Sequence, residues 1–250
     1  MLITSLHTCS RKGLIFKNLW GVFMKERKMF SGELALCLGL IFNSFATTLM
    51  VKSGFGIASI SSVPYTLSLV FNKITFGVWN YSFQCFIVFL LVLITKKFKK
   101  QYIISFFLAV VFGYLIDFFN IFVPKLPNNM FLNTLYFIIS FFILSLGICF
   151  LLRCTMPILP IDTFTREIPI HFNLSYKVVK TRFDLISLAI TVILSIVFLK
   201  EFKGIGVGTV ICALTTGKIV AYIVSFIDKK YYFKPTVFKN KDEAKENFIS

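Results

Sequence analysis

Residues 152–162 read LRCTMPILPID, and they end a run of about twenty apolar residues with an arginine, two prolines and an aspartate. A similar interruption occurs earlier, where LMVKSGFGIASIS (49–61) ends the first long apolar run with a lysine and two glycines. Proline lacks the N–H donor of a helix and glycine has little helix preference, so both residues interrupt helices. Two apolar runs therefore end in the same way, which indicates an internal repeat.

The repeat extends well beyond the interruptions. With Lys52 placed over Arg153, Ser59 meets Pro160 and Ser61 meets Asp162. The match continues at a nearly constant offset of 100 to 104 residues, with ITFGVWNYSFQ (74–84) over LSYKVVKTRFD (174–184), Ala109 over Ala213 and Gly113 over Gly217. We therefore predict two copies of one unit, in which a span is followed by an interruption, a short helix of about twelve residues and two further spans.

The composition places both copies in a membrane. Hydrophobic residues make up 57% of the 250 residues, charged residues only 15%, and phenylalanine alone occurs 32 times. Soluble domains contain about 45–50% apolar and about 25% charged residues. Stretches long enough to cross the ~30 Å hydrocarbon core as helices lie at roughly 32–52, 78–95, 102–123, 130–152, 182–199 and 205–227. The predicted fold is an all-α integral membrane protein with six transmembrane helices.

The distribution of positive charge predicts the orientation. Twenty-one Lys and Arg residues lie on one side of the predicted spans and five on the other, with Lys218 inside the last span. Because Lys and Arg concentrate in cytoplasmic loops, both termini of this cell-membrane protein are expected in the cytoplasm. The charges at the span ends suit anionic lipid headgroups, and their placement argues against nucleic acid despite a net charge of +16.

These boundaries divide the chain into four parts. Residues 1–30 form a basic tail with an interfacial helix, 31–124 the first repeat, 125–228 the second repeat, and 229–250 a polar tail. Each repeat has three spans, an odd number, so the second repeat is expected to insert upside down relative to the first. Inverted repeats of this kind recur in secondary transporters, where interrupted helices meet at a site near the membrane midplane.

The interruptions are therefore the candidate solute site. Ser61 and Asp162 are expected to cap the short helices, and helix N-termini beside Lys52 and Arg153 would favour an anionic group. The alternative is a plain interfacial loop followed by a surface helix. The candidate solute-binding residues, including two charges from the membrane interior, are Lys52, Ser59, Ser61, Asp117, Arg153, Pro160, Asp162 and Lys218.

Stripes of small residues on two spans predict close helix packing. Ala109 and Gly113 lie four residues apart in the third span, and Ala213 and Gly217 do so in the sixth. Small residues let helix backbones approach closely, so the third and sixth spans are expected to pack against each other. Asp117, on the same face, has Lys218 as its expected partner, and the alternatives are a structural ion pair, a neutral hydrogen-bonded aspartate, or a role in proton or ion coupling.

Several kinds of chemistry have no support in the sequence. The chain has two histidines, no C-x-x-C, no H-E-x-x-H and no G-x-S-x-G, so no enzyme activity, metal site or cofactor is predicted. The charged residues around the start of the fifth span are expected to form a solvated helix end: Lys177, Lys180, Arg182 and Asp184.

The two interruptions and GIGVGTVICALTTGKIV (204–220) resemble the YczE/YitT-type bacterial inner-membrane proteins over roughly residues 30–228. SISS (59–62) stands where that family has S-P-W-D, whereas the second half keeps Pro160 and Asp162. The resemblance implies a six-helix bacterial membrane protein and names no substrate.

Two functions are expected from these features. The first is a small secondary transporter of an anionic or zwitterionic solute. The second is a non-transporting accessory protein for the export or maturation of a secreted peptide or natural product. A bundle of 250 residues is small for a transporter, so a homodimer is plausible.

Overall fold

The chain forms a bundle of long apolar helices. The computed structural model describes residues 28–154, 156–200 and 205–234. Within them, six helices are long and apolar enough to cross a membrane, which confirms the predicted multi-pass helical fold. They are α2 (Gly32–Ser53), α4 (Phe76–Thr95), α5 (Gln101–Phe122), α6 (Met130–Arg153), α8 (Tyr176–Leu194) and α9 (Val207–Lys230). The 3-10 turn η1 (Val123–Lys125) extends α5, and the π-helical turn η2 (Ser195–Leu199) extends α8. The predicted interfacial helix lies outside the described residues, and so does the predicted polar C-terminal tail from residue 235 onward, whereas residues 229–234 of that tail belong to the end of α9 and to the strand β2 (Tyr231–Lys234).

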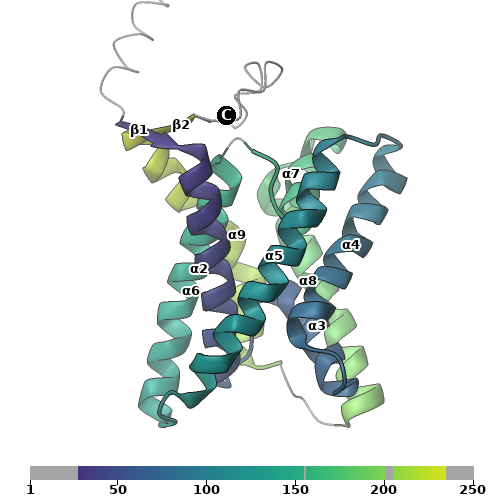
Figure 1. The fold of residues 1–250 in the computed structure, drawn as a ribbon, viewed down its shortest axis with the longest axis vertical. Helices are drawn as coiled ribbons and strands as arrows, with labels where there is room; N and C mark the ends of the chain where they lie inside the picture. Colours follow the sequence, from purple (N-terminus) through teal and green to yellow (C-terminus); the bar gives the residue numbers. More distant parts are fainter. Residues whose placement is uncertain (1–27, 155, 201–204, 235–250) are drawn as a thin grey trace, which may run out of the picture.

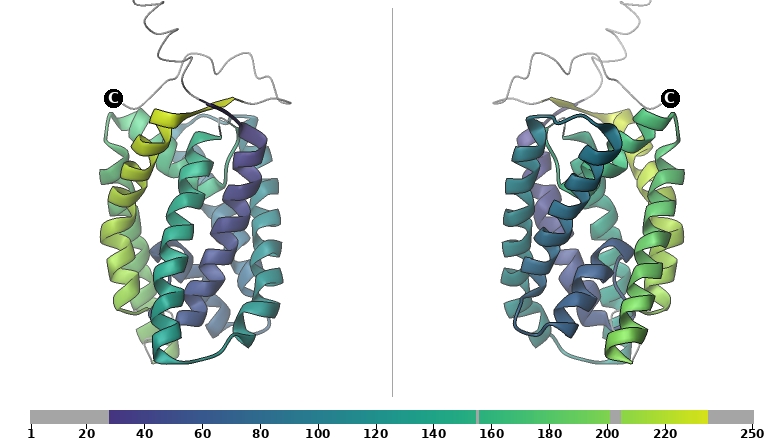
Figure 2. Two further views of the ribbon diagram at one scale, coloured as in Figure 1. Left: turned by 90° about the vertical axis from the view of Figure 1, so that its left-hand side faces the viewer. Right: turned by 90° about the vertical axis from the view of Figure 1, so that its right-hand side faces the viewer.

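Two short helices follow the interruptions, with the predicted length of about twelve residues. They are α3 (Ser59–Val70) and α7 (Pro160–Phe172). α3 lies in the lower part of the bundle in Figure 1 and α7 near its upper end, so the two short helices are at opposite ends of the spanning helices. Both lie among the long helices rather than on an outer surface, which does not agree with the surface-helix alternative (Figures 1 and 2).

The starts of the short helices differ from prediction. α3 begins at Ser59 and α7 at Pro160, with Ala58 and Leu159 as N-caps that make no side-chain hydrogen bond. The prediction that Ser61 and Asp162 are the N-caps is therefore wrong, because each lies at the third helical position. Proline suits the first position, since its fixed φ is helical and its missing N–H would have no acceptor there.

The second span of each half also begins earlier than its apolar stretch suggests. α4 starts after Thr75, whose hydroxyl accepts from the Val78 amide at 3.3 Å. α8 starts after Ser175, whose hydroxyl accepts from the Val178 amide at 3.4 Å. These N-caps satisfy otherwise unpaired first-turn amides and extend both helices toward the membrane surface.

A small parallel sheet joins the two ends of the described chain. β1 (Lys28–Ser31) pairs with β2 (Tyr231–Lys234), with Phe30 opposite Phe233. The Phe30 ring stacks on Phe150 of α6 at a centroid distance of 5.8 Å. The sheet lies at the end of the bundle where α2 begins and α9 ends (Figure 2). The alternation of residues in these short segments did not predict strands.

The packing of the helices follows the same pattern in both halves. The most extensive contact is between α2 and α6, the first helix of each half. α3 packs on α8 and α7 packs on α4, so each short helix contacts the second span of the other half. The pairs α4–α5 and α8–α9 form helical hairpins. In addition, α2 packs on α5 in the first half and α6 packs on α9 in the second half. Exchanging the two halves leaves this list of neighbours unchanged.

The predicted packing of the third span on the sixth is wrong. α5 packs on α4 and α2, and α9 packs on α8 and α6. A Cβ added at Gly113 would lie 2.7 Å from the Gly77 carbonyl oxygen, whereas one at Gly217 would first meet the Lys180 side chain. The connections between the paired helices are short, which favours antiparallel neighbours. The small-residue stripes with the fully buried Ala109 and Ala213 therefore serve packing within each half.

Candidate functional site

A cavity of about 60 Å³ with both polar and apolar lining residues lies between the helices of the bundle. Each of the six spanning helices of the described chain contributes at least one lining residue, and so do the first turns of α3 and α7. This volume has room for a few water molecules or a small solute. The polar lining residues are Asn43, Thr47, Ser59, Ser61, Asn80, Gln84, Asp162, Lys180, Asp184 and Thr216.

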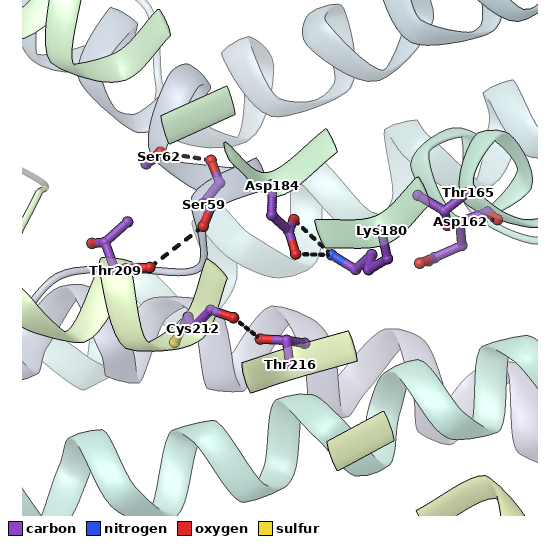
Figure 3. A network of polar contacts seen from close by, with 9 residues as sticks. All are labelled: Ser59, Ser62, Asp162, Thr165, Lys180, Asp184, Thr209, Cys212 and Thr216. Atoms are coloured by element: carbon purple, nitrogen blue, oxygen red, sulfur yellow. Dashed lines mark hydrogen bonds and ion pairs between the residues drawn. The ribbon is translucent and has the colours of Figure 1, made fainter. Parts of the chain in front are cut away.

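A buried ion pair forms one wall of the cavity. The Lys180 ammonium donates to both carboxylate oxygens of Asp184, at 2.8 and 2.9 Å (Figure 3). The two residues are four positions apart on α8, and their exposed fractions are 4% and 2%. The prediction that these residues form a solvated helix end is therefore wrong. Each charge neutralises the other, which allows α8 to carry them into the bundle.

The first half carries an uncharged counterpart of this pair. The Gln84 side-chain amide donates to the Asn80 Oδ1 atom at 2.7 Å, and both residues are buried on α4. The repeat alignment of 74–84 over 174–184 places Asn80 on Lys180 and Gln84 on Asp184. The sequence reading missed these four residues as a site, although polar residues inside apolar spans were the available signal.

The third position of each short helix provides a second matched pair. Ser61 in α3 and Asp162 in α7 both line the cavity, and Asp162 is 7% exposed. Burial raises the pKa of Asp162 from 3.8 to about 6, although the positive charges of Lys180 and Arg166 act in the opposite direction. Figure 3 shows Asp162 next to Lys180, on the opposite side from Asp184. All the formal charges in the cavity lining thus come from the second half.

The raised pKa of Asp162 predicts a pH dependence of stability. Because the folded-state pKa exceeds the usual 3.8, folding favours the protonated acid, and this contribution is lost as pH rises through about 6. We expect the melting temperature of the purified protein to fall between about pH 4 and pH 6 and to level off above pH 7, with a smaller fall in Asp162→Asn. Thermal unfolding in detergent at several pH values measures this. Identical pH profiles for the two proteins would contradict the assignment.

The remaining predicted residues of the short helices have structural contacts. Ser59 lines the cavity, and its hydroxyl donates to the Thr209 carbonyl oxygen at 3.5 Å. Pro160 is buried at the first position of α7. These two residues therefore lie in the predicted region, at the first turns that border the cavity.

The predicted charges outside the short helices do not line the cavity. The Lys52 ammonium donates to the Pro124 carbonyl oxygen at 3.0 Å, and Arg153 pairs with Asp228 near the end of α9. Lys52 and Arg153 thus lie outside the cavity lining, because each extends from a helix end to a neighbouring segment. Arg153 and Asp228 join α6 to α9.

Asp117 on α5 is hydrogen-bonded to the start of α4. Its carboxylate accepts from the Thr75 hydroxyl at 2.7 Å and from the Gly77 amide at 2.9 Å. The predicted pair with Lys218 is wrong, because α5 packs on α4 and Lys218 is exposed on α9. Asp117 instead satisfies a first-turn amide of α4, where a negative charge also suits the helix dipole.

Glycines connect the first interruption to the start of α9. The Gly208 amide donates to the Phe55 carbonyl oxygen at 2.9 Å, and the Ile57 amide donates to the Thr209 hydroxyl at 3.1 Å. Gly56 has φ +112, and a Cβ there would lie 2.2 Å from the Thr209 hydroxyl oxygen. A side chain at this position would therefore separate the segments. The glycines of the 204–208 stretch that lie in the described chain serve this contact, which positions α3 against the cavity.

The fold and cavity define a multi-pass helical membrane protein with a buried polar site. Within the described part of the chain, no three His, Cys, Asp or Glu side chains come together to hold a metal. The chain belongs to DUF6198, a family of unknown function, whose pattern it matches over residues 30–225. No curated protein and no solved structure matches the chain.

Proposed function

We propose that this protein is a small secondary transporter of the cell membrane, built from two inverted repeats, that encloses its solute in the cavity between the helices. The repeat alignment, the odd number of spans in each half and the positions of α3 and α7 at opposite ends of the bundle support an inverted arrangement. The excess of positive charge on one side of the spans supports cytoplasmic termini.

One observation carries this proposal above the others. The first turns of both short helices line the same cavity, together with residues of all the spanning helices in the described chain. In transporters with inverted repeats, interrupted helices supply the solute site at the interface of the two halves. A solute held there would contact both halves at once, so its binding could respond to movement of one half against the other.

The lining narrows the expected solute class. Lys52 and Arg153, which favoured an anion in the sequence, are engaged outside the cavity. The cavity lining carries a positive charge on Lys180 and negative charges on Asp184 and Asp162. Buried charges require partners of opposite sign, so a zwitterionic solute suits the cavity better than a simple anion.

Blocking the cavity tests this proposal. Thr216 is buried in the cavity lining on α9, whereas its neighbour Thr215 does not line the cavity. We expect Thr216→Met to reduce solute uptake at least tenfold and Thr215→Met to leave it within twofold of the unchanged protein. The assay follows uptake of a metabolite mixture from cell extract into proteoliposomes by mass spectrometry, with size-exclusion chromatography as the control for folding.

Two results would reject the transporter. The first is equal uptake by empty and protein-containing vesicles. The second is unaltered uptake by a folded Thr216→Met variant. A protein that moves no solute but is repeatedly isolated with a second membrane protein would instead act as a non-transporting accessory.

A further inference from the structure

We propose that Asp162 binds the ammonium group of a small amine or amino-acid-like solute, and that a proton and this ammonium group compete for the same carboxylate. This inference rests on the proposed function and specifies its substrate class. It assigns opposite ends of the cavity to opposite ends of the solute, with the cationic end at the first turn of α7.

The charges of the lining favour a cationic group. Lys180 donates to both oxygens of Asp184, so this pair is internally neutralised. An ionised Asp162 then gives the lining residues of the described chain one net negative charge. In a buried site of low dielectric, such a charge is costly without a counter-ion, and a solute ammonium group would supply it.

The hydrogen-bond acceptors of the cavity lining also favour an ammonium group. Gln84 is 1% exposed and lines the cavity, and its Oε1 atom has no hydrogen-bond partner among the described residues, whereas its amide nitrogen donates to Asn80. The lining therefore offers acceptor oxygens from Gln84 and Asp162, while Lys180 is engaged with Asp184. An ammonium group carries up to three N–H donors and no acceptor, so it complements this surplus.

The two halves of the chain differ in charge at the first turn of their short helices. Ser61 occupies the third position of α3, whereas Asp162 occupies the third position of α7. The negative Asp162 offsets the positive end of the α7 dipole, but α3 has no acidic residue in its first turn. A solute carboxylate would consequently be favoured toward α3 and its ammonium group toward α7.

Protonation should control this site. Among the described residues, the charged and titratable groups that act on Asp162 or that its charge affects are Arg166 on α7 itself, Lys180, Asp184 and Tyr176 on α8, and Cys154 at the end of α6. Protonated Asp162 is neutral and binds a cation weakly, and its pKa of about 6 places the change near neutral pH. Arrival of the ammonium group would release the carboxyl proton to water, with no other reactant required.

Equilibrium binding to the full-length protein in detergent tests the inference without any transport. The probes are ethylammonium, glycine and propionate, which carry a cation, both charges and an anion respectively. We expect ethylammonium and glycine to bind at pH 8, measured by isothermal titration calorimetry, with affinity at least tenfold weaker at pH 5. Propionate should bind at least tenfold more weakly than ethylammonium at pH 8.

Matched variants separate Asp162 from a general charge effect. Asp162→Asn should lose ethylammonium binding and its pH dependence. Glu167→Gln should retain both, because Glu167 lies on the same helix but contacts Lys99 and Tyr102 outside the cavity. Thermal unfolding of both variants checks that they are folded.

Three outcomes would overturn the inference: binding of propionate alone, full ethylammonium binding by folded Asp162→Asn, or no binding of any probe. Uptake of another solute by a protein that binds no amine would overturn this inference and leave transport intact. Amine binding without uptake would retain the site and reject the transporter.

Discussion

Replacing Lys180 by methionine is expected to destabilise the bundle by about 3–5 kcal/mol, because it leaves the Asp184 carboxylate buried without its partner. Lys180 and Asp184 are 4% and 2% exposed, so the remaining carboxylate would be largely desolvated without the ammonium group. Asp162, on the neighbouring α7, adds a further negative charge nearby. We therefore expect Lys180→Met to unfold or aggregate when it is extracted in mild detergent.

The first half of the chain supplies the rescue variant. Asn80 and Gln84 occupy the positions that align with Lys180 and Asp184, and they form a neutral hydrogen bond of 2.7 Å. The double variant Lys180→Asn with Asp184→Gln should therefore fold, since both buried charges are removed together and a neutral pair can replace them. It should also retain solute uptake, because the pair that it replaces is internally neutralised and Asp162 remains in the cavity.

Unfolding free energies in a detergent series measure the stability of these variants, and proteoliposome uptake measures their function. A stable Lys180→Met protein would show that Asp184 finds another partner or is neutral in the fold. A double variant that folds no better than Lys180→Met would show that neutral amides cannot replace the ion pair in α8.

Substituting the two aligned glycines by alanine is expected to give opposite results. A Cβ at Gly113 would lie 2.7 Å from the backbone oxygen of Gly77, so α5 must move away from α4. A Cβ at Gly217 meets nothing closer than 3.7 Å, at the Lys180 and Thr181 side chains. Overpacking costs about 1–3 kcal/mol, whereas alanine in a helix gains up to about 1 kcal/mol over glycine.

The helix gain applies to both variants and cancels in the comparison, so we expect Gly113→Ala to be less stable than Gly217→Ala by about 1–3 kcal/mol. The separation of α4 from α5 would also weaken the hydrogen bonds from Thr75 and Gly77 to Asp117. Thermal unfolding of the two variants side by side measures the difference. Equal stabilities would mean that the α4–α5 contact adjusts without strain.

Much of the architecture could be read from the residues alone. The long apolar runs required membrane-spanning helices, because a backbone in lipid must satisfy its own hydrogen bonds. The glycines and prolines after Lys52 and Arg153 predicted the interruptions, and the short helices that follow have the expected length. Their first residues were misplaced by two positions, since Pro160 begins α7 more readily than Asp162 caps it.

The sequence did not predict which helices pack against each other. The small residues of the two stripes show which helix faces allow close packing, but they do not identify the helix that packs there. These residues are Ala109, Gly113, Ala213 and Gly217. Short connections favoured the α4–α5 and α8–α9 hairpins over a contact between α5 and α9. The pairing of Asp117 with Thr75 and Gly77, rather than with Lys218, follows directly from that choice.

The candidate site was also predicted from the sequence only in part. Ser59, Ser61 and Asp162 were predicted from the interruptions and line the cavity. Lys180 and Asp184 were assigned to a solvated helix end, since lysine and aspartate are rarely buried. Their burial becomes acceptable only when the pair forms and α3 packs on α8, which brings together residues more than one hundred positions apart.

The sequence by itself determined the membrane location, the spans and the duplicated unit, because hydrophobicity, helix interruption and repeat spacing are local properties of the chain. The tertiary structure decided which helices touch and which charges become buried. Those outcomes depend on the relative fit of distant surfaces, and the cavity between the two short helices exists only after both halves have packed together.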